Sequence, residues 1–231
     1  MTELAGAVWP RIPVAPLLVV PLGSVEQHGH HLPLATDTAV ATAVARAAMP
    51  ELPDALLAPA LPYGASGEHE GFPGTVSLGT EALTAVLVEL GRSAGRWARR
   101  VLVVNGHGGN LEALRAAVPL LRSEGRDAAW FACGVPGGDA HAGRTETSLM
   151  LHVEPAEVRV DDAVAGETAP LADLLRRLRA GGVRAVSPTG VLGDPAGASA
   201  AEGGDLLAAM TTRLVAAVGR WTVDPTGRLG S

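Results

Sequence analysis

The chain has 231 residues, of which 47% are hydrophobic, so it can bury the core of one full domain. Its formal net charge is −6, which argues against nucleic acid or an anionic membrane as the main partner. All 18 basic residues are arginine, which excludes catalysis by a Schiff-base lysine. The longest apolar stretch, from Val14 to Leu22, is interrupted by two prolines and is too short to span a bilayer.

The cysteine content and the N-terminus bear on the compartment. The single cysteine, Cys133, excludes an internal disulfide framework and favours a reducing environment. The N-terminus has no basic segment followed by an apolar one, which argues against a signal peptide. No repeat or linker divides the chain. The sequence therefore predicts a cytoplasmic protein with a single domain over residues 1–231.

Short apolar runs alternate with longer segments of helical periodicity. Buried strands are predicted over residues 17–21, 56–62, 101–104 and 128–133. Helices are predicted over residues 38–49, 80–97, 111–123, 145–151, 171–180 and 201–221, with Thr80 as the N-cap of the second. This alternation predicts an α/β fold, a three-layer α/β/α arrangement with a mainly parallel central sheet.

Polar residues gather after three of the predicted strands, where an open parallel sheet binds its ligands. Glu26 and His28 are two residues apart, so in an extended segment both side chains point the same way. The residues with useful chemistry in these segments are Glu26, His28, Asp37, His107, His141 and Glu146. A mixed set of carboxylates and imidazoles suits zinc, manganese or Fe(II).

Taken singly, these residues have simpler explanations. Asp37 precedes a predicted helix and could only cap it, and Glu146 suits the dipole at a helix start. The turn Asn105–Asn110 (NGHGGN) could cradle a phosphate before a helix. A non-catalytic module that binds phosphate or another ligand is therefore the alternative from a different class. The absence of a Gly-x-x-x-x-Gly-Lys motif weakens this alternative.

At these residues the sequence resembles the creatininase (creatinine amidohydrolase) family. The matching stretches follow in order: residues 21–37 (PLGSVEQHGHHLPLATD), 105–110 (NGHGGN), 141–148 (HAGRTETS) and 190–203 (GVLGDPAGASAAEG). The resemblance implies a metal-dependent amidohydrolase with two divalent ions, zinc, Fe(II) or manganese. It also implies the layered creatininase-like sheet and a homo-oligomer, a hexamer or larger.

The resemblance further implies roles for individual residues. Asp37 would bridge the two ions, Glu26 and His107 would hold one of them, and His28 and Glu146 would hold the other. His141 would occupy the position of the family's catalytic histidine. There it would give a proton to the leaving amine, a step that typically contributes 10²–10⁴-fold.

Other residues are predicted to contact the substrate. Backbone N–H groups of Gly108 and Gly109 could stabilise charge on the scissile carbonyl. Glu68 and His69 lie in a glycine-rich loop that could line the entrance, and Arg144 could grip a substrate carboxylate. His30 and His31 neighbour the predicted ligands, where a supporting role is favoured over coordination.

Two departures from the family pattern disfavour creatinine as the substrate. Creatinine-hydrolysing members carry a glutamate two residues after the motif histidine, where this chain has Gly109. They also carry a tryptophan shortly before the catalytic histidine, where this chain has residues 136–138 (PGG). Within the family, the chain most resembles a compact member that releases the modified C-terminus of a ribosomal precursor peptide. A hydrolase of a small cyclic amide or a formamide is the alternative within the family.

Overall fold

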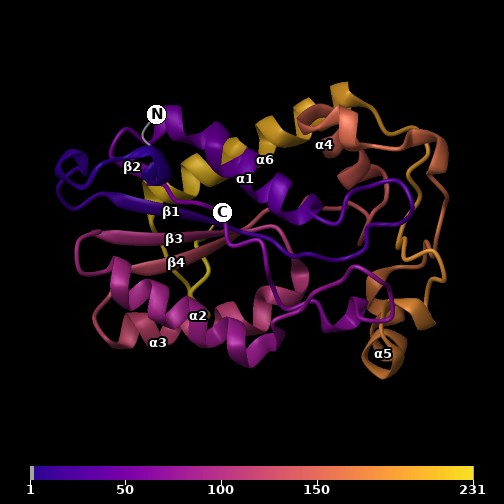
Figure 1. Cartoon of the computed structure of the whole chain (residues 1–231), viewed down its shortest axis with the longest axis horizontal. Helices are drawn as coiled ribbons and strands as arrows, with labels where there is room; N and C mark the ends of the chain where they lie inside the picture. Colours follow the sequence, from indigo (N-terminus) through magenta and orange to yellow (C-terminus); the bar gives the residue numbers. More distant parts are fainter. Residues whose placement is uncertain (1–2, 231) are drawn as a thin grey trace.

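The computed structural model describes residues 3–230, and its centre is a four-stranded parallel sheet (Figure 1). The strands are β1 (Leu17–Leu22), β2 (Ala55–Leu57), β3 (Arg100–Asn105) and β4 (Ala128–Ala132), in the order β2-β1-β3-β4. Every pairing is parallel. The prediction of a mainly parallel central sheet is confirmed.

Helices cover both faces of this sheet. The helices on one face are α1 (Thr36–Ala48), α4 (Arg144–Val153) and α6 (Ala200–Arg220), and those on the other are α2 (Gly79–Ala94) and α3 (Leu111–Ser123) (Figure 1). Helix α5 (Leu171–Gly181) lies beyond one end of the sheet. The predicted three-layer α/β/α arrangement is therefore confirmed.

Strand β1 explains why these apolar runs form the sheet. All six of its residues are buried. Leu17 and Val19 pack with residues of α1 and α6, whereas Leu18 and Val20 pack with residues of α2 and α3. Because successive side chains in a strand point to opposite faces, a strand covered on both sides must be apolar throughout.

Several predicted boundaries are wrong for local reasons. The second strand was expected over residues 56–62 but ends at Leu57, because prolines at 59 and 62 cannot donate ladder hydrogen bonds. Thr80 is not an N-cap, since α2 begins at Gly79 and Leu78 holds the cap position. Asp37 lies inside the first turn of α1, not before the helix.

The carboxyl ends of β1, β3 and β4 open at the same edge of the sheet, and the loops after them carry the predicted site residues. Among residues 3–230, no helix combines the length and apolarity that a membrane crossing needs. The single domain over residues 1–231 stays a prediction, and residues 1, 2 and 231 lie outside the described part of the chain.

Candidate metal centre

Asp37 lies between two imidazoles that come from different loops. Its Oδ1 is 3.2 Å from His28 Nε2, and its Oδ2 is 3.3 Å from His107 Nδ1. His28 follows β1, and His107 follows β3. The two oxygens of one buried carboxylate thus face two separate nitrogen donors.

Glu26 is fully buried beside three histidines. Its Oε2 is 3.1 Å from His107 Nε2, and its Oε1 is 3.2 Å from His69 Nε2 and 3.8 Å from His141 Nδ1. Within the described chain, both Glu26 oxygens and Asp37 Oδ2 lack a partner in hydrogen-bond geometry. A buried carboxylate without a donor costs several kcal/mol, about the penalty that a bound cation removes.

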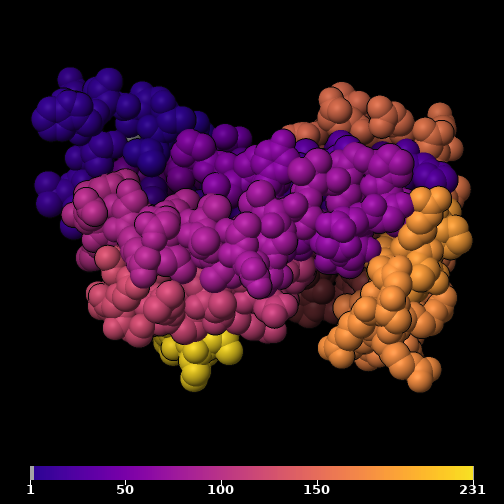
Figure 2. Space-filling view, turned by 60° about the horizontal axis from the view of Figure 1, so that its bottom comes forward, coloured from indigo at the N-terminus to yellow at the C-terminus, as the bar shows by residue number. Residues whose placement is uncertain are grey.

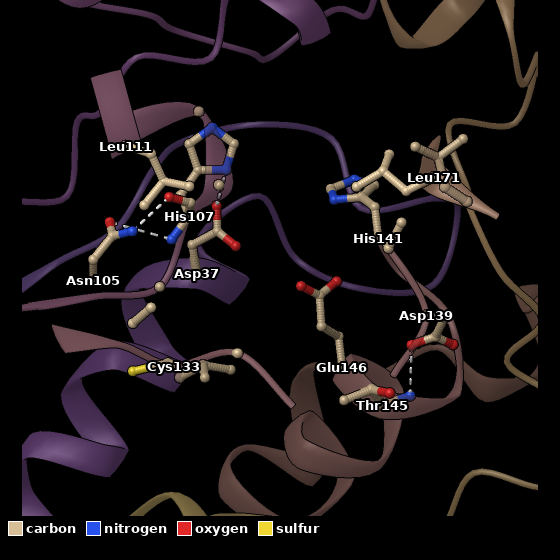
Figure 3. Close-up of a pocket in the computed structure, with 18 of the residues that line it drawn as sticks. Asp37, Asn105, His107, Leu111, Cys133, Asp139, His141, Thr145, Glu146 and Leu171 are labelled. Atoms are coloured by element: carbon tan, nitrogen blue, oxygen red, sulfur yellow. Dashed lines mark hydrogen bonds and ion pairs between the residues drawn. The ribbon is translucent and has the colours of Figure 1, made fainter. Parts of the chain in front are cut away.

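Glu146 approaches the cluster from the first turn of α4. Its Oε2 is 3.9 Å from His28 Nε2 and accepts a hydrogen bond of 2.6 Å from the Ala142 N–H. Figure 3 shows Asp37 and His107 on one side of the pocket and His141 and Glu146 on the other. Three of the predicted ligands, Asp37, His107 and Glu146, therefore line the same pocket as His141, whereas Glu26 and His28 are fully buried.

Three overlapping groups have ligand atoms that all lie within 4.8 Å of one another. They are Glu26 with His28 and Asp37, His28 with His141 and Glu146, and Glu26 with His69 and His141. His107 belongs to none of these groups, although each of its ring nitrogens faces a carboxylate. The orphaned oxygens and the mixed donor set fit divalent zinc, manganese or Fe(II).

The buried charges of the cluster shift one another's pKa values. Burial lowers the pKa of His28, but the charge and hydrogen bond of Asp37 outweigh it and raise the pKa to about 9. Burial likewise opposes protonation of His107, yet Glu26 and Asp37 raise its pKa well above the usual value. Burial opposes ionisation of Asp37, but His28 and His107 hold its pKa below the usual range. Without metal, protons on these two histidines balance the buried carboxylates.

On the other side of the pocket, the pKa shifts favour the neutral forms of the side chains. Desolvation raises the pKa of Glu146 to about 7, with Asp37 adding to the effect against the pull of His28. Burial lowers the pKa of His141 well below its usual value, and His28 and His69 lower it further. Burial also lowers the pKa of His69. His141 and His69 are therefore neutral near pH 7.

The cluster opens into a pocket of about 650 Å³ whose lining is largely apolar. The larger apolar side chains of this pocket are Val40, Leu111, Val135, Leu149, Leu171, Leu175, Leu178, Val183, Leu192 and Met210. Figure 2 shows the surface hollowed between the orange α5 segment and the magenta α3. Glu68, His69, Gly108 and Gly109 also line the pocket, and His69 is buried at the side of Glu26.

Glu68 lies over Gly109. Its Oε1 is 3.4 Å from His107 Nε2, and it would lie 2.6 Å from a Cβ at position 109. The loop at residues 67–69 thus brings a carboxylate to the space above Gly109. Sequence reasoning placed Glu68 only at the entrance, because the approach of this loop to His107 depends on tertiary packing.

Arg144 does not line the pocket. Its Nε donates to both oxygens of Glu202, at 3.0 and 2.9 Å, and joins α4 to α6. His30 is exposed, whereas His31 is buried and lies 2.8 Å from the hydroxyl oxygen of Thr147. His31 thereby fixes the loop after β1 against α4, next to Glu146.

Three amides that sequence reasoning did not single out brace the site. Asn105 donates to the His107 carbonyl at 2.7 Å, and Asn110 donates to Asn105 Oδ1 at 3.0 Å. Gln27 lies between His69 and His141. The asparagines of NGHGGN thus hold the turn that carries His107, which their regular spacing in the motif could have suggested. No pattern in the sequence marks Gln27 in the same way.

Cys133 follows β4 and lines the pocket. Desolvation raises the pKa of its thiol to about 12, so the sulfur stays protonated near neutral pH. A protonated thiol fits a structural residue and not a nucleophile.

A parallel α/β sheet with buried carboxylates and imidazoles at its carboxyl edge has the arrangement of a metal-dependent hydrolase. The sequence matches the creatininase family, described as creatinine amidohydrolase, over residues 7–218. The chain belongs to the creatininase family. It is 57% identical to the mycofactocin precursor peptide peptidase of Mycolicibacterium smegmatis, over 94% of this chain and 90% of that protein. It is 34% identical to the creatinine amidohydrolase of Pseudomonas putida, over 64% of this chain and 68% of that protein.

Solved structures share the fold. A crystal structure of creatinine amidohydrolase aligns with a TM-score of 0.79 and 27% identity, over 95% of this chain and 97% of that chain. A mutant creatininase described as Zn-Zn type aligns with a TM-score of 0.73 and 27% identity, over 89% and 90% of the two chains. A structure described as creatininase Mn aligns with a TM-score of 0.77 and 26% identity, over 95% and 98%. The resemblance inferred from the motifs is confirmed.

Proposed function

We propose that this chain is a metal-dependent peptidase. Its substrate is the modified mycofactocin precursor peptide, made on the ribosome, and it cleaves an amide bond near the C-terminus of that peptide. The observation that carries the proposal is a set of buried carboxylates without donors at the base of a largely apolar pocket. The 57% identity to a mycofactocin precursor peptide peptidase selects the substrate within the family.

The shape of the pocket supports a peptide rather than creatinine. Its volume of about 650 Å³ is typical of sites that enclose a ligand of several residues or rings. Leu171 and Leu175 of α5 expose 46% and 40% of their surfaces beside it. A peptide end with apolar side chains would cover these leucines and exclude water from the polar floor.

In this proposal the ion-binding residues are Glu26, His28, Asp37, His107 and Glu146. Two divalent ions (zinc, Fe(II) or manganese), when bound there, would supply a Lewis acid and water activated near neutral pH. His141, which is neutral, can take a proton from the attacking water and pass it to the leaving amine. Backbone N–H groups of Gly108 and Gly109 would stabilise the developing charge on the carbonyl oxygen.

Metal analysis combined with a substrate panel tests the proposal. The purified protein is assayed for bound metal, stripped with a chelator and reloaded with zinc, manganese or, without oxygen, Fe(II). Each form is offered the modified precursor peptide, a formamide and creatinine, and products are identified by mass spectrometry. Cleavage of the peptide only by metal-loaded forms is expected. Full peptide cleavage in chelator, or hydrolysis of creatinine or the formamide but not the peptide, would contradict it.

The role of His141 has its own test. His141→Ala should keep its bound metal but lose at least about tenfold in kcat, because the leaving amine no longer receives a proton. Metal content and peptide cleavage are measured on the same preparation. Unchanged turnover with full metal content would show that the proton travels by another route.

We also propose that the protein is a homo-oligomer, a hexamer or larger, as the creatininase resemblance implies. Exposed apolar side chains near the N-terminus support this, with Trp9 at 86% and Val14 at 98% exposure. The molar mass in solution, measured by light scattering, should correspond to at least six chains.

A further inference from the structure

The side-chain amide of Gln27 lies at the centre of a buried hydrogen-bond network. Its Nε2 is 2.9 Å from His69 Nδ1, 3.0 Å from His141 Nε2 and 3.1 Å from the Gly190 carbonyl oxygen. Its Oε1 accepts a hydrogen bond of 2.8 Å from the Gly29 N–H. The network therefore touches two histidines of the site, and neither of them is a predicted metal ligand.

Main-chain groups fix which way the amide points. The Gly29 N–H can only donate, so it must face the amide oxygen, and the Gly190 carbonyl can only accept, so it must face the amide nitrogen. Gly190 also leaves the space for this arrangement. Its φ is +82°, and a Cβ there would lie 1.8 Å from Gln27 Oε1. A flipped amide would place its nitrogen against the Gly29 N–H, donor against donor, and its oxygen against the Gly190 carbonyl, acceptor against acceptor.

The main-chain carbonyl of Gln27 determines which ring nitrogen of His141 carries the hydrogen. His141 Nε2 lies 2.7 Å from this carbonyl oxygen, which can only accept, so Nε2 carries a hydrogen. His141 Nε2 cannot also accept from the Gln27 amide. In neutral His141 the other nitrogen, Nδ1, is bare, and it faces Glu26 Oε1 at 3.8 Å.

The second hydrogen of the Gln27 amide determines the tautomer of His69. Of the two hydrogens on Gln27 Nε2, one goes to the Gly190 carbonyl and the other can go only to His69 Nδ1. His69 Nδ1 is then an acceptor, and the hydrogen of neutral His69 lies on Nε2. That N–H faces Glu26 Oε1 at 3.2 Å.

We propose that Gln27 is a positioning residue that gives His69 and His141 different roles in the site. His69 presents an Nε2–H toward the Glu26 carboxylate, so its Nε2 has no free lone pair for a metal ion. His141 presents a bare Nδ1, so it must take a proton there before it can give one to a leaving group. This inference goes beyond the proposed peptidase activity, because it holds for any substrate.

Nitrogen NMR of labelled histidines measures these tautomers directly. The chain has seven histidines, so the zinc-loaded protein labelled with ¹⁵N-histidine gives a small set of signals in magic-angle-spinning spectra. Protonated and bare ring nitrogens differ widely in chemical shift, and His69→Gln and His141→Gln assign the two residues. In the wild-type protein we expect a hydrogen on Nε2 of both rings. A hydrogen on Nδ1 of His69 would overturn the proposal.

Gln27→Met supplies an internal control, because it removes the amide but keeps the main-chain carbonyl. His69 should lose its single tautomer, with a change in tautomer ratio of about fivefold or more for one lost hydrogen bond. His141 should keep its hydrogen on Nε2. Thr75→Val removes a hydroxyl that accepts the Gln27 main-chain N–H and should leave both histidines unchanged. An unaltered His69 in Gln27→Met would refute the positioning role.

Zinc content gives a second readout without substrate. His69→Gln can still offer an N–H near the position of Nε2, so it should bind as much zinc as the wild-type protein. Loss of zinc in this variant would make His69 a ligand and overturn the inference. His28→Gln is the matched control, since it should lose zinc. If His28→Gln kept all its zinc, the proposed ligand set would fail instead, so the two failures are distinguishable.

Discussion

At the scale of single residues, Asp37 joins the two halves of the candidate centre. One of its oxygens lies 3.2 Å from a ring nitrogen of His28, and the other lies 3.3 Å from a ring nitrogen of His107. Because the three residues come from α1 and from the loops after β1 and β3, the position of Asp37 fixes the spacing of the two imidazoles. A carboxylate in this position can serve two cations at once.

Asp37→Ala should therefore remove both metal ions, not one. The alanine leaves His28 and His107 without the shared carboxylate that draws cations between them. Metal content by mass spectrometry should fall to well below one ion per chain. Asp54→Ala, which changes an exposed aspartate outside the pocket, should keep the wild-type content. One full equivalent of metal in Asp37→Ala would limit Asp37 to a single ion.

The raised pKa of His28 predicts a proton release. Without metal its pKa is about 9, so at pH 7 the ring is charged, and it must lose that proton to bind a cation. Zinc binding at pH 7 should release at least one proton per chain and weaken as the pH falls. Calorimetry in buffers of different ionisation enthalpy measures the number. Zinc binding without proton release would contradict the assignment of His28.

The raised pKa of His28 also makes the stability of the metal-free protein depend on pH. The folded pKa of His28 lies above its unfolded value of 6.5, so its contribution to the stability of the metal-free protein is present in full below pH 6.5. The contribution is lost as the pH rises through about 9. Metal-free protein should therefore unfold more easily at pH 9 than at pH 7.

At the scale of elements, α6 holds α4 and its Glu146 against the sheet. The two helices touch closely at Gly203, where a Cβ would lie 1.9 Å from the Ser148 carbonyl oxygen. Arg144 and Ser148 of α4 both bond to Glu202 of α6. The place of Glu146 thus depends on a helix contact as well as on its own loop.

Gly203→Ala should destabilise the protein by about 1–3 kcal/mol, because overpacking forces the two helices apart. Gly219→Ala in the same helix is the control, since a Cβ there meets nothing within 4 Å. It should be neutral or stabilise by up to about 1 kcal/mol through helix propensity. Denaturant unfolding measures both. Equal stability of the two variants would show that α4 and α6 can separate without cost.

Periodicity predicted most elements because burial follows it directly. The helix over residues 111–123 was predicted with its observed bounds, whereas β1 is one residue longer at one end and β3 is one residue longer at each end. The ligand candidates were found because carboxyl ends of parallel strands share an edge. Arg144 shows the limit of sequence proximity. It lies two positions before Glu146, and residues two apart on a helix do not face each other.

What the sequence could not predict depends on contacts between distant segments. Glu68 reaches His107, and Gln27 reaches His69, His141 and Gly190, through loops whose paths no local pattern sets. A glutamine between two ligand candidates has no periodicity to mark it. Only the folded chain reveals that its amide contacts two histidines.

At the scale of the whole molecule, the donors of the site come from segments far apart in the chain, from Glu26 to Glu146. In the unfolded chain these donors meet only at the entropic cost of closing long loops. They come together once β1, β3 and the helices that cover them are in place. A zinc ion would therefore bind only the folded structure, because an unfolded or partly folded chain does not bring these donors together.

This separation governs the kinetics of folding. Zinc should slow unfolding and leave the refolding rate unchanged, because the transition state does not yet contain the assembled donors. At a free zinc concentration 100 times its Kd, the gain of about 2.7 kcal/mol would appear as a roughly hundredfold slower unfolding rate. Stopped-flow measurements with zinc or chelator test this. Faster refolding in zinc would mean that the cation gathers its donors early and guides the chain into its fold.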